Sequence, residues 1–112
     1  MNLSEEKDGK VLVIGLSGKL DVEGTKLFGE RITQILESGE RYVLLDFTDV
    51  AYINSSGLHI LILVARRLAT SGGMLVLAGA SDRIQNVLKI SGLSAILTLQ
   101  PTKAEALASF PQ

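Results

Sequence analysis

The sequence contains no cysteine among its 112 residues and has only one histidine. The lack of cysteine excludes disulfide frameworks, thiolate nucleophiles and cysteine metal sites together. One histidine is too few for the usual transition-metal sites. Aromatic residues make up only 4% of the chain, which argues against the stacking platforms that bind single-stranded nucleic acids. We therefore expect neither a metal nor a bound cofactor.

The chain also lacks an excess of one charge and any long apolar run. Its 11 basic and 12 acidic residues leave no cationic surplus to neutralise a phosphate backbone. No apolar run reaches the roughly 18–20 residues that span a bilayer, and residues 1–10 lack the apolar region of a signal peptide. The sequence thus predicts a cytoplasmic protein that binds neither nucleic acid nor membrane.

What the sequence does have is enough apolar character, 46% of residues, to form the core of one domain, 1–112. Apolar, β-prone runs alternate with segments of helical periodicity. This alternation favours an α/β fold with a mostly parallel central sheet of four to five strands and about four helices. The expected strands cover 10–16, 41–46, 74–78 and 95–99, with an edge strand before the Asp8-Gly9 turn. The expected helices begin near residues 21, 54, 81 and 102.

The helix expected over 54–70 is unusual because two adjacent serines open it. At 100° per residue, one broad side forms the core face. That side carries Leu58, Leu61, Val64, Ala65, Leu68 and Ala69. The opposite side carries Ser56, His59, Leu63, Arg66, Arg67 and Thr70, with Ile60 at its margin. Ser55 points about 100° away from Ser56 and nearer the core, so the helical wheel predicts that Ser56 is the exposed hydroxyl.

The second side of this helix combines an apolar spot with basic residues, a pattern typical of a docking surface. A phosphoserine at position 56 would bring about −1.5 to −2 charges to the helix N-terminus, where free N–H groups favour an anion. The fold could hold that charge, whereas a partner packed on the same face would be displaced. The serines could equally be plain helix caps. The aliphatic run 60–64 could also be a strand, although the absence of Gly and Pro over 58–71 favours a helix.

The run from Val43 to Leu58 resembles the signature of the STAS domain found in bacterial anti-sigma factor antagonists. Both have an apolar strand that ends in Asp, a short connector, and then a Ser-Ser-Gly-Leu helix start. The upstream Gly18-Lys-Leu-Asp21 resembles a second element of the family. The resemblance covers about residues 8 to 100. Asn54 stands where the family commonly has Asp, and His59 stands where a small residue is common.

This resemblance implies a phosphorylation switch. In the family, the free antagonist binds an anti-sigma factor that is also a serine kinase, and thereby releases the sigma factor. The kinase uses ATP to phosphorylate the second serine of the motif, here Ser56, and a metal-dependent PP2C-type phosphatase reverses the reaction. We expect no enzymatic activity and a monomer when the protein is free. The expected partner-binding residues are Asp21, Asn54, Ser55, Ser56, His59, Ile60, Leu63 and Arg67.

One alternative keeps the fold but not the switch: a constitutive scaffold or subunit of a signalling or lipid-transport assembly. Its support is Asn54, which removes a charge beside Ser56. A protonated His59 could instead pair with a phosphate, or be simply solvated.

Another alternative is an enzyme or a small-molecule binder. A catalytic serine would need a base and an oxyanion hole, and the sequence holds no phosphate-binding P-loop motif. Asp21, Asp46 and Asp49 follow strand ends and could bind Mg²⁺, but such residues are also ordinary caps and turns.

Overall fold

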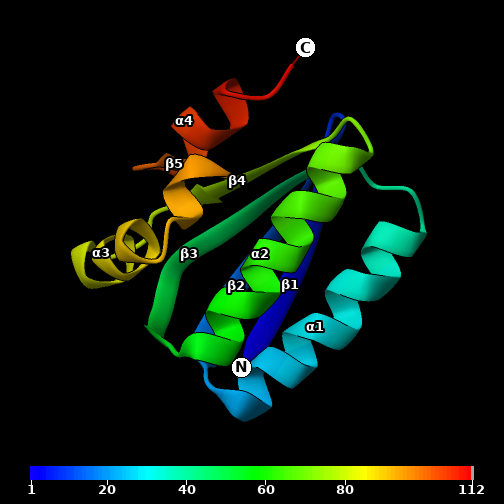
Figure 1. Cartoon of the computed structure of the whole chain (residues 1–112). Helices are drawn as coiled ribbons and strands as arrows, with labels where there is room; N and C mark the ends of the chain where they lie inside the picture. The colour runs from blue at the N-terminus through cyan, green and yellow to red at the C-terminus, as the bar shows by residue number, and fades with distance from the viewer. Residues whose placement is uncertain (112) are drawn as a thin grey trace.

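The computed structural model describes residues 1–111, so the last residue of the expected domain 1–112 lies outside it. Five strands form one sheet in the order β1-β2-β3-β4-β5, in which only β1 is antiparallel to its neighbour. The strands are β1 (Asn2–Asp8), β2 (Val11–Leu20), β3 (Tyr42–Ile53), β4 (Met74–Ala78) and β5 (Thr98–Gln100). The helices are α1 (Val22–Glu37), α2 (Ser55–Thr70), α3 (Asp82–Ile90) and α4 (Lys103–Ala108), with a 3₁₀ turn, η1 (Leu93–Ala95). The predicted fold class is confirmed (Figure 1).

The helices cover the two faces of the sheet unequally. Figure 1 shows α1 and α2 side by side across one face, and α3 adds to the same core. Among the described residues, α4 is the only helix on the other face, where Ala106 and Phe110 contact a smaller cluster of strand residues. Successive residues of a strand point to opposite faces, so Val43 and Leu45 join the larger core and Leu44 the smaller one. Within the described residues, no helix is both long and apolar enough to span a bilayer.

The expected edge strand before the Asp8-Gly9 turn is present. Asp8 pairs with Val11, and Gly9 has a φ of +59°, a value that glycine adopts without steric cost. The first strand is therefore a hairpin arm added to an otherwise parallel sheet.

The expectation that the second long strand ends at Asp46 is wrong, because β3 continues to Ile53. Its partner β2 also continues past the expected end at Leu16, as far as Leu20. The added parts pair with each other, with Lys19 opposite Tyr52, after register shifts between Gly15 and Ser17 and between Gly18 and Lys19. The segment that we expected to be a connector is thus part of the sheet, and it carries β3 up to the start of α2.

The last strand is also displaced from its predicted position. We expected residues 95–99, but β5 is Thr98–Gln100 because Leu93–Ala95 form a 3₁₀ turn. Leu93 and Leu97 are buried in the larger core, so the apolar residues before β5 are used for packing rather than for strand pairing.

Candidate functional site

The helices α1 and α2 begin next to each other at one edge of the sheet. Leu20 and Ile53 are paired at the ends of β2 and β3, and the Asn54 N–H donates a hydrogen bond to the Leu20 carbonyl at 3.1 Å. The residues that follow each strand, Asp21 and Asn54, are the N-caps of α1 and α2. The two predicted caps are therefore neighbours at the carboxyl edge of parallel strands, which is where α/β proteins commonly place their sites.

Two glycines let the first turn of each helix lie directly on the strand ends. A Cβ atom at Gly24 would be 1.9 Å from the Lys19 carbonyl oxygen. A Cβ atom at Gly57 would be 2.7 Å from the Ile53 side chain and 3.0 Å from the Leu20 carbonyl oxygen. Real Cβ atoms do not approach so closely, so only glycine permits this packing. The helix starts are consequently held in fixed positions by the sheet.

The Asn54 side chain organises the start of α2. Its Oδ1 atom accepts a hydrogen bond from the Gly57 N–H at 3.1 Å and a second from the Ser56 hydroxyl at 2.7 Å. At α1, one Asp21 carboxylate oxygen accepts from the Gly24 N–H at 2.9 Å. Both caps satisfy backbone donors that no helical carbonyl can reach. The Ser56 hydroxyl is thereby held in one orientation by its neighbour.

The predicted exposure of the two serines is wrong. Ser55 is exposed, whereas Ser56 is partly buried. The helical wheel assumes that a core lies beneath every residue, but β3 ends at Ile53 and the first helical residue that rests on the strand ends is Gly57. Ser55, which precedes Gly57 in the first turn, is therefore left exposed. Ser56 keeps partial access to solvent.

The rest of α2 largely follows the prediction. Leu61, Val64, Ala65 and Leu68 are buried, whereas Leu58 is only partly buried and Ala69 is exposed, contrary to its predicted place in the core. His59, Leu63, Arg66, Arg67 and Thr70 are exposed on the opposite side.

We call this side of the helix the α2 face; it consists of Ser56, His59, Leu63, Arg66 and Arg67. Its two ends are far apart. At 1.5 Å per residue, Leu63 lies about 10 Å and Arg67 about 16 Å along the helix from Ser56. Arg67 is therefore too distant to pair with a phosphate on Ser56, and as a cation in the last turn it complements the helix dipole. Ile60 is partly buried and faces α1, where its side chain is 3.6 Å from the Cβ position of Gly29. It contributes mainly to helix packing.

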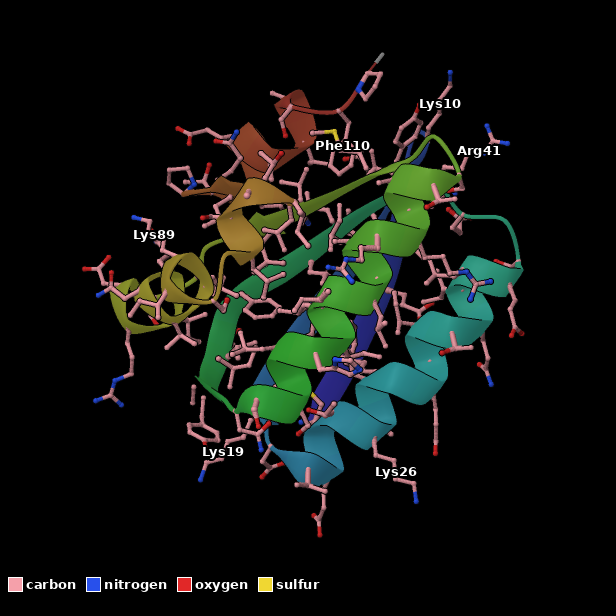
Figure 2. The ribbon with its side chains drawn as sticks, viewed as in Figure 1. Lys10, Lys19, Lys26, Arg41, Lys89 and Phe110 are labelled. Carbon is pink, nitrogen blue, oxygen red and sulfur yellow. The ribbon has the colours of Figure 1, made fainter. Side chains whose placement is uncertain are left out.

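Several exposed residues near the helix starts were not singled out from the sequence. Val22 is 72% exposed directly after the Asp21 cap, and Tyr52 is 47% exposed near the end of β3. Figure 2 shows Lys19 and Lys26 projecting at this same end of the molecule. Tyr52 was missed because its segment was expected to be a connector. The buried residues of this part of β3, Phe47, Val50 and Ile53, come at every third position, so the apolar pattern lacks the alternation that would have indicated a strand.

The aspartates that could have formed a Mg²⁺ site are not brought together. Asp21 caps α1, while Asp46 accepts hydrogen bonds from the Thr48 N–H at 3.0 Å and the Thr48 hydroxyl at 2.6 Å. Asp46 and Asp49 line a hollow against β1. Among residues 1–111, no three His, Asp or Glu side chains form a group that could hold a metal ion. Asp21 therefore serves as a helix cap, and Asp46 bonds to Thr48 within β3.

Comparison with known proteins gives a consistent result. Residues 2–106 match the family model of the STAS domain. The chain is 30% identical over 109 residues to the anti-sigma-B factor antagonist of Listeria monocytogenes, covering 94% of this chain and 95% of that relative. An anti-sigma factor antagonist from Mycobacterium paratuberculosis has a similar structure, with a TM-score of 0.88 at 21% identity and coverage of 96% and 92%. The phosphorylated form of the Bacillus cell fate determinant SpoIIAA gives a TM-score of 0.76 at 23% identity, with coverage of 96% and 97%.

Proposed function

Because the chain belongs to the STAS domain family, and its relatives are anti-sigma factor antagonists, we propose that it works as a partner switch controlled at Ser56. In its unphosphorylated form it binds an anti-sigma factor that is also a serine kinase. Phosphorylation of Ser56 by that kinase ends the complex, and a PP2C-type phosphatase restores the free form. The expected contact residues are Asp21, Asn54, Ser55, Ser56, His59, Leu63 and Arg67, with Ile60 contributing at the margin.

The observation that carries this proposal is the position of the Ser56 hydroxyl at the first turn of a helix with an exposed apolar and basic face. A phosphate there would meet the unpaired N–H groups and the positive end of the α2 dipole, so the fold would tolerate it. The same dianion would lie inside any interface formed on the α2 face, where burying an unpaired charge is costly. The switch would act on the interface and leave the fold intact.

The first test is modification of the purified protein by the anti-sigma factor kinase and ATP, followed by mass spectrometry. Because Ser55 is the more exposed serine, Ser55→Ala and Ser56→Ala variants are needed to assign the site. We expect one added phosphate in wild type and Ser55→Ala, and none in Ser56→Ala. Modification of Ser56→Ala, or an unmodified wild-type chain, would contradict the proposal.

The second test is binding to the anti-sigma factor by calorimetry. Ser56→Asp places a negative charge at the switch and should weaken binding at least about tenfold, equivalent to about 1.4 kcal/mol. Ser56→Ala should bind as wild type does, because the Asn54 cap on Gly57 remains. Ser55→Asp is the matched control for charge, and we expect it to have the smaller effect.

The constitutive alternative also has one supporting observation, since the Ser56 hydroxyl is already hydrogen-bonded to Asn54 and only partly accessible. A scaffold of this kind would bind its partner equally well as wild type and as Ser56→Asp, and the calorimetric comparison distinguishes the two functions.

A further inference from the structure

We infer that Asn54 is a two-state positioning residue: its carbonyl oxygen holds the free Ser56 hydroxyl, and its NH₂ group holds the phosphate after modification. This inference rests on the proposed phosphorylation of Ser56. In the second state, the phosphate replaces Asn54 as the acceptor that caps α2. Asn54 would thus tune the regulation of the site in addition to its expected contact with a partner.

The free state follows directly from the structure. One atom, Asn54 Oδ1, accepts from both the Ser56 hydroxyl at 2.7 Å and the Gly57 N–H at 3.1 Å. In both bonds Asn54 supplies only the acceptor oxygen, so its NH₂ group takes no part in them. A carboxylate would serve this state equally well, since Asn and Asp are comparable helix caps.

Phosphorylation removes the donor from one of these bonds. The Ser56 Oγ atom forms a bond to the γ-phosphorus of ATP, the bond from that phosphorus to ADP breaks, and the hydroxyl proton passes to a base of the kinase. Oγ and Asn54 Oδ1 are then two acceptors facing each other with no proton between them. A half-turn of the Asn54 amide replaces this repulsion with a hydrogen bond from Nδ2 to the phosphate. An aspartate has no donor to offer and would add a like charge.

The half-turn leaves the Gly57 N–H without its acceptor, and this group needs another. Gly57 is buried against the ends of β2 and β3, so solvent is a poor substitute. The phosphate is attached to the residue immediately before Gly57 and presents three acceptor oxygens at the helix N-terminus. It can therefore take over the cap that Asn54 gives up.

The test uses phosphoserine inserted at position 56 during translation of the full chain, so that no kinase is involved. Thermal melting is measured for wild type and Asn54→Ala, each with Ser56 and with phosphoserine. Without phosphate, loss of the cap should lower the melting temperature by about 5 °C. With phosphate, which caps the helix itself, the decrease should be less than about half as large. Equal decreases in both forms would overturn the inference.

A second readout follows the phosphate itself by ³¹P NMR titration. Donation from the Asn54 amide favours the dianion, so the second pKa of the phosphate should rise in Asn54→Ala by about 0.5 or more, a threefold change in the proton affinity. In Asn54→Asp, which keeps the cap and therefore its folded state, the rise should be at least about one unit. An unchanged pKa in either variant would overturn the inference.

A chain that the kinase leaves unmodified at Ser56 would contradict the proposed function alone, because the melting and NMR measurements do not depend on the kinase.

Discussion

At the scale of single residues, the two glycines at positions 29 and 57 have opposite roles although both lie in helices. Gly57 lets the start of α2 rest on the strand ends, where a Cβ atom would be 2.7 Å from Ile53. Gly29 lies within α1, and a Cβ atom there would be 3.6 Å from the nearest atom of Ile60, an ordinary contact distance. The distance between the helix backbone and the neighbouring element thus decides whether an added Cβ atom clashes or makes an ordinary contact.

We predict that Gly57→Ala destabilises the protein by about 1–3 kcal/mol, because the first turn of α2 must move away from the sheet. Gly29→Ala is the matched control and should stabilise by about 0.5–1 kcal/mol, because alanine is the better helix former. Urea unfolding followed by circular dichroism measures both values. A stabilising Gly57→Ala would contradict the close packing.

A second residue-scale prediction concerns Thr25 in α1, whose hydroxyl is buried without a hydrogen-bond partner among the described residues. An unpaired buried hydroxyl is costly, and valine has the same shape and a similar helix propensity. Thr25→Val should therefore raise the free energy of unfolding by about 1 kcal/mol and the melting temperature by a few degrees. A lower melting temperature would show that the hydroxyl is satisfied in solution.

At the scale of elements, β1 is held to the molecule by charges as well as by its pairing with β2. Glu5 forms an ion pair with Arg31 of α1 at 2.5 Å, and Lys7 pairs with Glu40 just before β3 at 2.5 Å. Glu6, on the opposite face of the strand, pairs with Lys103 of α4. The edge strand is therefore tied to both layers of helices, and its run of charged residues also opposes pairing with other chains.

This arrangement predicts a pH dependence. The hydrogen bond from Arg31, together with its charge, lowers the pKa of Glu5 against the opposing effect of partial burial. A carboxyl whose pKa is lower in the folded state adds stability above its unfolded pKa, about 4.3, and loses it as the pH falls through the folded value. Glu5→Gln should therefore reduce the urea midpoint slightly at pH 7, and this reduction should shrink as the pH falls below the unfolded pKa.

The size of this effect should be small because exposed ion pairs contribute little and are screened by salt. Glu30→Gln, on the exposed side of α1, is the control, since Glu30 forms no ion pair with any described residue. An equal loss in both variants at pH 7 would argue against the Glu5 pair.

The elements also show which features a sequence can predict. The caps Asp21, Asn54 and Ser81 were predicted because each bonds an N–H only three residues away. The continuation of β3 to Ile53 was not predicted, because it depends on pairing with the end of β2, which comes from a distant part of the chain. The predicted exposure of Ser55 relative to Ser56 was wrong for the same reason, because that exposure depends on where the strands beneath the helix end.

At the scale of the whole molecule, α2 spans most of one side. Sixteen residues extend about 24 Å at 1.5 Å per residue, in a molecule with extents of 32 × 26 × 24 Å. A partner that senses both the switch at Ser56 and the basic residues at the far end must cover this length. Such a footprint is compatible with the roughly 800 Å² per partner of a standard interface.

We predict that Leu63→Ala weakens binding to the anti-sigma factor about three- to tenfold without changing the melting temperature, because the side chain is 47% exposed and lies in the middle of the α2 face. Ile90→Ala is the control, because Ile90 is 88% exposed but belongs to α3. Calorimetry with the same partner measures both. Equal weakening by the two variants would place the interface elsewhere.

The start of β1 and the end of α4 lie at opposite ends of the molecule (Figure 1). Met1 lies against Gly18 and lines a hollow with Asp21 and Glu23, beside the helix starts. Any polypeptide joined before Met1 therefore emerges next to the switch. A tether for surface immobilisation, a fluorescent label or a fused domain would compete with a partner in this position, whereas a label attached to α4 would leave the α2 face free.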